Sequence, residues 1–145
     1  WAMQPISILL VEDNPGDVAL LRSAFRKSAV PTNLVVAGDG AEALDVFHCR
    51  HGHENDPAID MALFDINLPG MSGLELLAQI KSDAELCSTP VIMLTSSSAP
   101  GDIEQAYRHH ANAYLTKPAG IADLTRLVEA LEGFWFSLAR LPTRH

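Results

Sequence analysis

Five residues whose side chains could do chemistry follow directly after runs of apolar residues: Glu12, Asp13, Asp65, Thr95 and Lys117. Three carboxylates packed together repel one another and need a cation. Oxygen ligands of modest charge suit Mg²⁺, which keeps several waters and also binds phosphate oxygens. A lysine ammonium suits one phosphoryl oxygen, and a threonine hydroxyl can donate to a second. Together the five residues predict a phosphoryl-transfer site with Mg²⁺ as cofactor.

The sequence lacks the parts that would hold a nucleotide donor. It contains no GxxxxGK loop followed by Ser or Thr, and no kinase signature set. The phosphoryl donor must therefore arrive from outside, and a carboxylate is the expected acceptor. Aspartate can act as such a nucleophile and form an aspartyl phosphate.

Apolar runs alternate with stretches of helical spacing along the chain. The runs predicted as strands are residues 6–11, 32–37, 59–64, 90–94 and 113–115. Because the first run is apolar at nearly every position, it indicates a parallel strand covered by helices on both faces. Five strands alternating with five helices predict an α/β fold, as one doubly wound domain over residues 1–145. Ligands of such sheets bind at the carboxyl ends of the strands, which is where the five residues fall.

Composition excludes several classes of protein. The chain has 145 residues, of which 48% are hydrophobic, enough for a sizeable core. Ten Lys and Arg against 18 Asp and Glu give a net charge of −8, which argues against a nucleic-acid binder. No apolar run approaches the length of a membrane span, and two cysteines make no disulfide framework. We therefore expect a cytoplasmic protein.

The last predicted helix is apolar over more than one face. One seam of apolar residues contains Ile121, Leu124, Val128, Leu131, Trp135 and Leu138. A second row contains Leu127, Phe134 and Leu141. The surplus fits either a wide core face or a subunit interface. The interface interpretation is favoured, with Leu127, Phe134 and Trp135 in a dimer contact.

Four segments in order resemble the response-regulator receiver domain of two-component signalling. They are LVEDN at 10–14, FDINLPGMSG at 64–73, LTS at 94–96 and YLTKP at 114–118. The resemblance covers roughly residues 6–138. It implies a flavodoxin-like or CheY-like (βα)5 domain with sheet order 2-1-3-4-5. It also implies a signalling protein rather than an enzyme.

The resemblance implies an acceptor and a metal site. Asp65 would be the phosphoacceptor. Asp13 and Asp65 would bind Mg²⁺ directly, and Glu12 through water. Asn67 would offer its backbone carbonyl to the ion.

Further roles at the site are implied in the same way. Thr95 would bind the phosphoryl group after transfer. Lys117 would pair with Asp65 and then with phosphoryl oxygens, and the bond between Lys117 and Pro118 would be cis. Tyr114 matches the switch aromatic of the family, although a half-buried strand tyrosine without a switching role is the simpler alternative.

A narrower resemblance is to the stand-alone regulators paired with cyanobacterial and bacterial phytochrome kinases. It rests on EDNPGD at 12–17, ANAYLTKP at 111–118 and FW at 134–135. It implies a phytochrome-type histidine kinase as partner, no output domain, and a homodimer through the fourth helix, fifth strand and fifth helix. A phosphate shuttle and a phosphorylation-independent interaction module remain alternatives. A phosphohydrolase of the haloacid-dehalogenase kind would need a second Asp where Asn67 stands.

Overall fold

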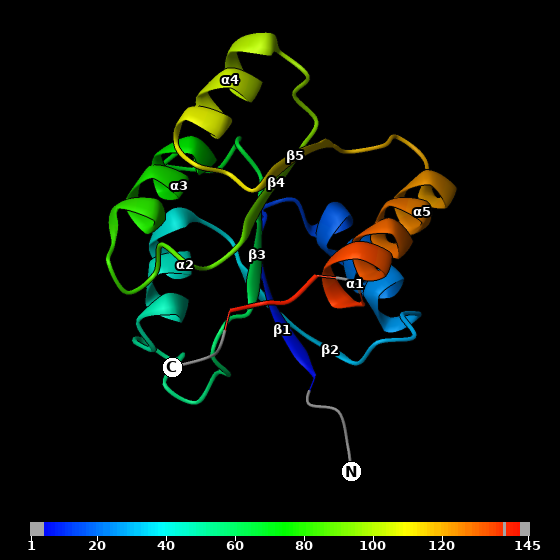
Figure 1. Ribbon diagram of the computed structural model, residues 1–145, viewed down its shortest axis with the longest axis horizontal. Helices are drawn as coiled ribbons and strands as arrows, with labels where there is room; N and C mark the ends of the chain where they lie inside the picture. The colour runs from blue at the N-terminus through cyan, green and yellow to red at the C-terminus, as the bar shows by residue number, and fades with distance from the viewer. Residues whose placement is uncertain (1–4, 138, 143–145) are drawn as a thin grey trace.

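Five parallel strands form one sheet in the order β2-β1-β3-β4-β5, as the resemblance implied (Figure 1). The structure is a computed structural model that describes residues 5–137 and 139–142. The strands are β1 (Ile6–Val11), β2 (Thr32–Ala37), β3 (Met61–Phe64), β4 (Val91–Thr95) and β5 (Ala113–Thr116). The first two match their predicted bounds, and the other three shift by one or two residues at an end. For example, β4 begins after Pro90, which has no N–H to donate to a ladder.

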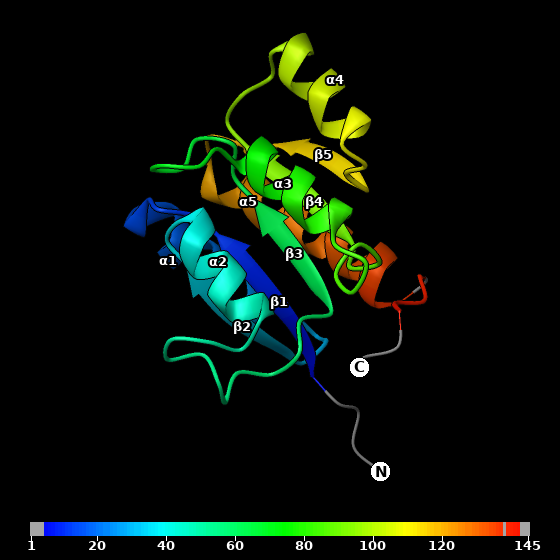
Figure 2. The same ribbon diagram turned by 90° about the vertical axis from the view of Figure 1, so that its left-hand side faces the viewer.

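Five α-helices follow the strands in alternation and cover both faces of the sheet. They are α1 (Pro15–Arg26), α2 (Gly40–Phe47), α3 (Gly73–Ser82), α4 (Pro100–Arg108) and α5 (Ile121–Leu131). Figures 1 and 2 show α1 and α5 together on one side of the sheet, and α2 and α3 on the other. Asn14 caps α1, because its side chain accepts a hydrogen bond from the Asp17 N–H at 3.1 Å, and Pro15 stands in the first turn.

Alternate residues of each central strand enter two different cores. In β1, Leu9 and Val11 pack with residues of α2 and α3, whereas Ile8 and Leu10 pack with residues of α1 and α5. All four are almost completely buried, which explains why the run is apolar at nearly every position. In the parallel register Val11 lies beside Phe64, so the residues that follow β1 and β3 emerge together.

The last helix differs from its predicted seam at its first residue. Leu124, Val128 and Leu131 are buried as expected, but Ile121 is 64% exposed. Ile121 is the first residue of α5, and packing on the sheet begins a turn later at Leu124. After Leu131 the chain forms a π-helix, η1 (Glu132–Phe136), and Trp135 within it is partly buried against the same core as Leu124 and Val128, as the seam predicts. Leu138 lies outside the described residues.

The helices within residues 5–137 and 139–142 are short. None of them is both long and apolar enough to cross a membrane.

Candidate functional site

The ammonium group of Lys117 is the centre of a cluster at the carboxyl ends of the strands. Its Nζ lies 2.6 Å from Glu12 Oε2, 3.0 Å from Asp65 Oδ2 and 3.0 Å from Asp17 Oδ2. The Lys117 side chain is only 11% exposed. A lysine ammonium has three N–H donors, so each donor has a carboxylate to bind. The structure therefore brings together the side chains of Lys117, Glu12, Asp65 and Asp17 at this edge of the sheet.

Backbone hydrogen bonds just beyond the strand ends hold these residues in place. The Asp65 N–H donates to the Val11 carbonyl at 3.1 Å, and the Lys117 N–H donates to the Thr95 carbonyl at 2.7 Å. These bonds continue the β1–β3 and β4–β5 ladders by one step. The side chains of Asp65 and Lys117 are thus fixed by the sheet rather than by a free loop.

Glycine at position 73 lets the chain pass close to Asp65. A Cβ placed on Gly73 would lie 1.9 Å from the Asp65 carbonyl oxygen. The Gly73 N–H also donates to the Ile66 carbonyl at 2.8 Å. The start of α3 therefore leans directly on the backbone of Asp65, which only glycine permits.

Burial and hydrogen bonds shift the pKa values of Glu12 and Asp65 in opposite directions. Burial raises the pKa of Glu12 to about 7, although its hydrogen bond from Lys117 acts against this. Burial also opposes ionisation of Asp65, but hydrogen bonds with Glu12, Thr95 and Lys117 outweigh it and lower the pKa of Asp65. Asp65 therefore ionises more readily than Glu12.

Thr95 and Tyr114 are joined through the loop that follows β4. The side chain of Thr95 is fully buried beside Asp65, and its Oγ1 accepts a hydrogen bond from the Ser97 N–H at 3.4 Å. The Tyr114 hydroxyl donates to the Ser97 carbonyl at 2.9 Å. The Tyr114 ring is half-buried and packs against the core. A displacement of Thr95 would thus reach Tyr114 through two hydrogen bonds.

The predicted metal ligands differ in exposure, since Asp65 is buried. Asp13 and Asn67 are exposed, and the Asn67 N–H donates to Asp65 Oδ1 at 3.4 Å. Within residues 5–137 and 139–142, no three His, Cys, Asp or Glu side chains form a ready-made metal cluster. The donor set still fits Mg²⁺, because this ion keeps most of its waters and needs only one or two carboxylates and a carbonyl.

One residue of the cluster and one peptide bond depart from the sequence-based expectations. Asp17 belongs to the EDNPGD segment and has no predicted role at the site, yet it contacts Lys117 directly. Its position in the first turn of α1, just after Glu12 and Asp13, was the available signal. The bond between Lys117 and Pro118, expected to be cis, is trans, the isomer that X–Pro bonds prefer.

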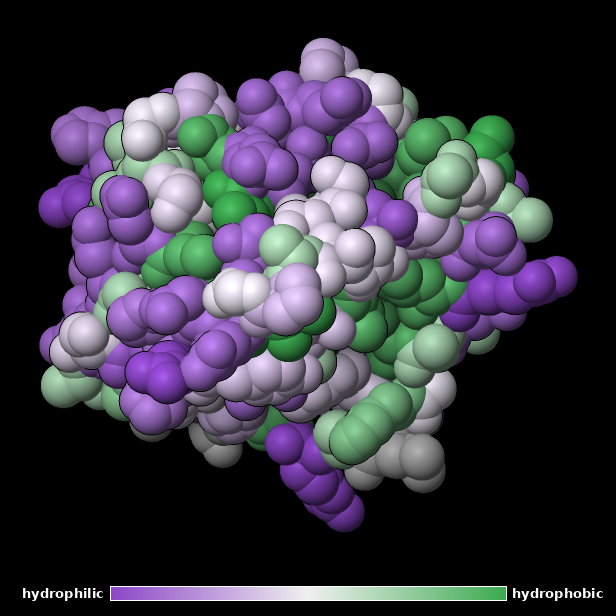
Figure 3. All heavy atoms as spheres, turned by 90° about the horizontal axis from the view of Figure 1, so that it is seen from above, coloured by the Kyte–Doolittle hydropathy of each residue, from purple (hydrophilic) through white to green (hydrophobic). Residues whose placement is uncertain are grey.

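The predicted interface residues gather beside the edge strand β5. The rings of Phe134 and Trp135 stack with centroids 5.3 Å apart, and Phe134 is 50% exposed. With Leu127 they line a groove whose floor includes Ala113 and Leu115 of β5. Seen from above, the surface is mostly hydrophilic, with a hydrophobic patch right of centre, on the side that holds α5 (Figure 3).

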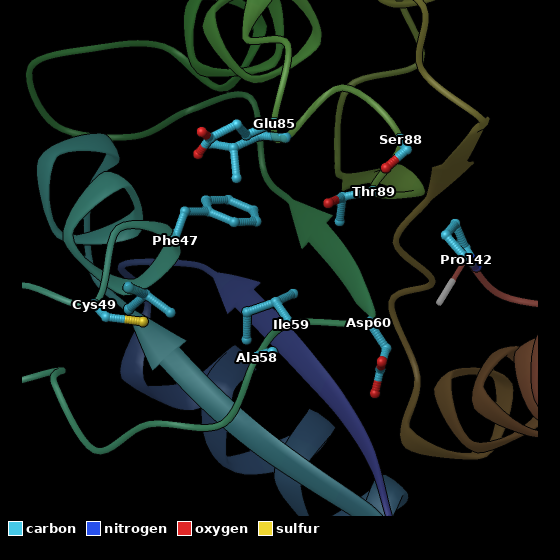
Figure 4. A pocket seen from close by; sticks show the side chains of 11 residues that line it. Phe47, Cys49, Ala58, Ile59, Asp60, Glu85, Ser88, Thr89 and Pro142 are labelled. Atoms are coloured by element: carbon cyan, nitrogen blue, oxygen red, sulfur yellow. The ribbon is translucent and has the colours of Figure 1, made fainter. Parts of the chain in front are cut away.

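Another cavity lies at the opposite edge of the sheet. It measures about 170 Å³, and its lining includes Phe47, Ile59, Asp60 and Thr89 (Figure 4). Asp60 precedes β3 and Thr89 precedes β4, so this cavity opens at the amino ends of the strands. None of the predicted site residues lines it.

Comparison with known proteins agrees with this fold. Residues 8–129 match the response regulator receiver domain, and the chain belongs to that family. It is 36% identical to the response regulator Rcp1 of Synechocystis sp. over 138 residues, which are 95% of this chain and 94% of Rcp1. It is 37% identical to the probable methanogenesis regulatory protein FilR2 of Methanothrix harundinacea, covering 97% of this chain and 90% of FilR2.

Solved structures place the chain among particular members of the family. The phosphorylated cyanobacterial phytochrome response regulator RcpA superposes with a TM-score of 0.91 at 39% identity, and the match covers 97% of this chain and 100% of RcpA. The Mn²⁺-bound form of Rcp1 superposes with a TM-score of 0.89 at 36% identity, covering 96% of this chain and 100% of Rcp1. The chain is thus a response-regulator receiver domain related to phytochrome response regulators.

Proposed function

We propose that this receiver domain accepts a phosphoryl group on Asp65 from a phosphohistidine of a sensor histidine kinase. A P–O bond forms to an Asp65 oxygen while the P–N bond breaks, and the electron pair of that bond stays on the imidazole nitrogen. The observation that carries the proposal is the buried Asp65 carboxyl group, whose Oδ2 lies 3.0 Å from Lys117 Nζ and which lies beside the buried Thr95. The phosphorylated state of its relative RcpA supports it.

The residues around Asp65 supply positioning and charge. Lys117 stabilises the added negative charge, and the Thr95 hydroxyl donates to a phosphoryl oxygen. Asp13, Asp65 and the Asn67 carbonyl would hold Mg²⁺, with Glu12 acting through water. When bound, the ion neutralises charge on the transferring phosphoryl group. The Mn²⁺-bound form of Rcp1 supports a divalent cation at this site.

Output by protein contact follows from the loop that joins Thr95 to Tyr114. Movement of Thr95 toward the phosphoryl group would disturb the hydrogen bond from Tyr114 to Ser97, and with it the start of α4. The surface made by α4, β5 and α5 is the proposed homodimer contact, with Leu127, Phe134 and Trp135 in it. The likeness to RcpA supports a phytochrome-type kinase as the donor.

Intact mass spectrometry after incubation with acetyl phosphate and Mg²⁺ tests this function. The wild type should gain one phosphoryl group, and the gain should disappear with EDTA or in Asp65→Asn. An adduct that persists in Asp65→Asn would overturn the assignment. No adduct with acetyl phosphate or with a phosphorylated kinase would favour the phosphorylation-independent interaction module.

A further inference from the structure

One of the three carboxylates on Lys117 differs from the other two. The side chain of Asp17 is 38% exposed, whereas those of Glu12 and Asp65 are 2% and 8% exposed. Asp17 also comes from the first turn of α1 rather than from the end of a strand. The Asp17 N–H donates to the Asn14 side chain, whereas the Asp17 carboxylate binds Lys117.

The three contacts leave Lys117 with no unused donor. The donor on Asp65 can pass to a phosphoryl oxygen of the same residue, but a second donor can reach the phosphoryl group only if Glu12 or Asp17 releases it. Releasing Glu12 would leave a buried polar group without its charged partner, which is costly. Releasing Asp17 is cheap, because water can replace the ammonium at an exposed carboxylate.

We propose that Asp17 is a positioning residue that holds Lys117 in the resting site and is displaced when Asp65 carries a phosphoryl group. The inference rests on the proposed function of Asp65. Because Asp17 competes for the same ammonium, it weakens the phosphorylated state relative to the resting one. It thereby sets how readily the switch is turned on.

Electrostatic repulsion acts in the same direction as this competition. Both carboxylates contact the same nitrogen, so Asp17 and Asp65 lie within about 6 Å of each other, close enough for their charges to interact. A phosphoryl group adds negative charge at Asp65, which Asp17 repels. Removing the charge of Asp17 should therefore favour the phosphorylated state on both counts.

The test is the affinity of the Mg²⁺-loaded protein for beryllofluoride, a phosphoryl mimic, followed in amide NMR spectra. Asp17→Asn, which keeps the shape and removes the charge, should bind beryllofluoride about two- to fivefold more tightly than the wild type. Asp17→Ala should show the same gain if the Asn variant is poorly folded. Asp17→Glu restores the charge and should stay within about twofold of the wild type. A gain of affinity is a change that simple damage to α1 would not produce.

A matched control is Glu75→Gln, which removes an exposed carboxylate from the first turn of α3. Glu75 is not among the carboxylates that contact Lys117, so the affinity of the Glu75→Gln variant for beryllofluoride should stay at the wild-type value. An equal gain in Glu75→Gln would reveal a general charge effect and overturn the inference. Unchanged or weaker binding in both Asp17→Asn and Asp17→Ala would also overturn it, while leaving the proposed function intact. If the wild type itself takes neither beryllofluoride nor a phosphoryl group, the proposed function fails first.

Discussion

Replacement of Gly73 by alanine tests how tightly α3 is built against the acceptor. The new methyl group would lie 1.9 Å from the Asp65 carbonyl oxygen, 2.8 Å from the Asp65 carbonyl carbon and 2.9 Å from the Ile66 Cα. All three are backbone atoms, so no side chain can rotate away. The backbone must move, and it is held there by the hydrogen bonds from Gly73 to Ile66 and from Asp65 to Val11.

The expected loss of stability comes from two opposing effects. Overpacking of this kind costs about 1–3 kcal/mol or more. Alanine in place of glycine returns at most about 1 kcal/mol through helix propensity. Because the clash is with backbone, the cost lies at the upper end of that range, and we expect Gly73→Ala to lower the free energy of unfolding by about 2 kcal/mol, measured by urea denaturation.

Gly101→Ala is the matched control, because Gly101 lies in α4 and an added Cβ there meets nothing within 4 Å. This variant should be as stable as the wild type or more stable, by up to about 1 kcal/mol. Gly73→Ala should also take up phosphoryl groups from acetyl phosphate more slowly, since Asp65 must shift. Wild-type stability together with wild-type uptake in Gly73→Ala would refute the reasoning.

Three further predictions concern other parts of the molecule. Hydrogen bonding to Asp56, opposed by burial and aided by Glu42, raises the pKa of His53. The stability that protonated His53 contributes should be fully present below pH 6.5, the ordinary pKa of histidine, and should be lost as pH rises through the raised pKa. In urea denaturation, the free energies of unfolding of the wild type and His53→Gln should therefore differ at low pH and converge at high pH. A difference that does not change with pH would contradict this. Phe134→Ser should convert the proposed dimer to a monomer in light scattering, and an unchanged mass would place the contact elsewhere. The Lys81 ammonium donates to the carbonyls of Cys87 and Thr89, before β4, and to the side chain of Asn112, before β5. Lys81→Met should therefore lower the free energy of unfolding by about 1–2 kcal/mol in urea denaturation. A smaller loss than in a variant of an exposed lysine would refute this role.

The sheet and the acceptor cluster were predictable because each rests on local patterns. Apolar runs covered on both faces identify the parallel strands, and the polar residue after each run must emerge at the same edge. Glu12, Asp65 and Lys117 meet there for this reason. Their roles as acceptor, metal ligand and charge partner remain predictions for the experiments above.

The remaining differences depend on features that periodicity does not record. Asp17 reaches Lys117 because of the angle at which α1 leaves β1, and no spacing rule contains that angle. The turn from α5 into η1 depends on a change from i→i+4 to i→i+5 hydrogen bonding, as in the bond from the Ala139 N–H to the Phe134 carbonyl. Ile121 continues the helical spacing but lies one turn ahead of the packed face, so spacing alone could not show that it is exposed.

The most direct test of the central claim is to locate the phosphoryl group on the chain. Borohydride reduces an aspartyl phosphate to homoserine, so treatment of the phosphorylated protein followed by peptide mass spectrometry marks the acceptor. The account predicts homoserine at position 65 and nowhere else, dependent on Mg²⁺. Homoserine at Asp13 or Asp17, or a phosphoryl group that resists borohydride, would contradict it.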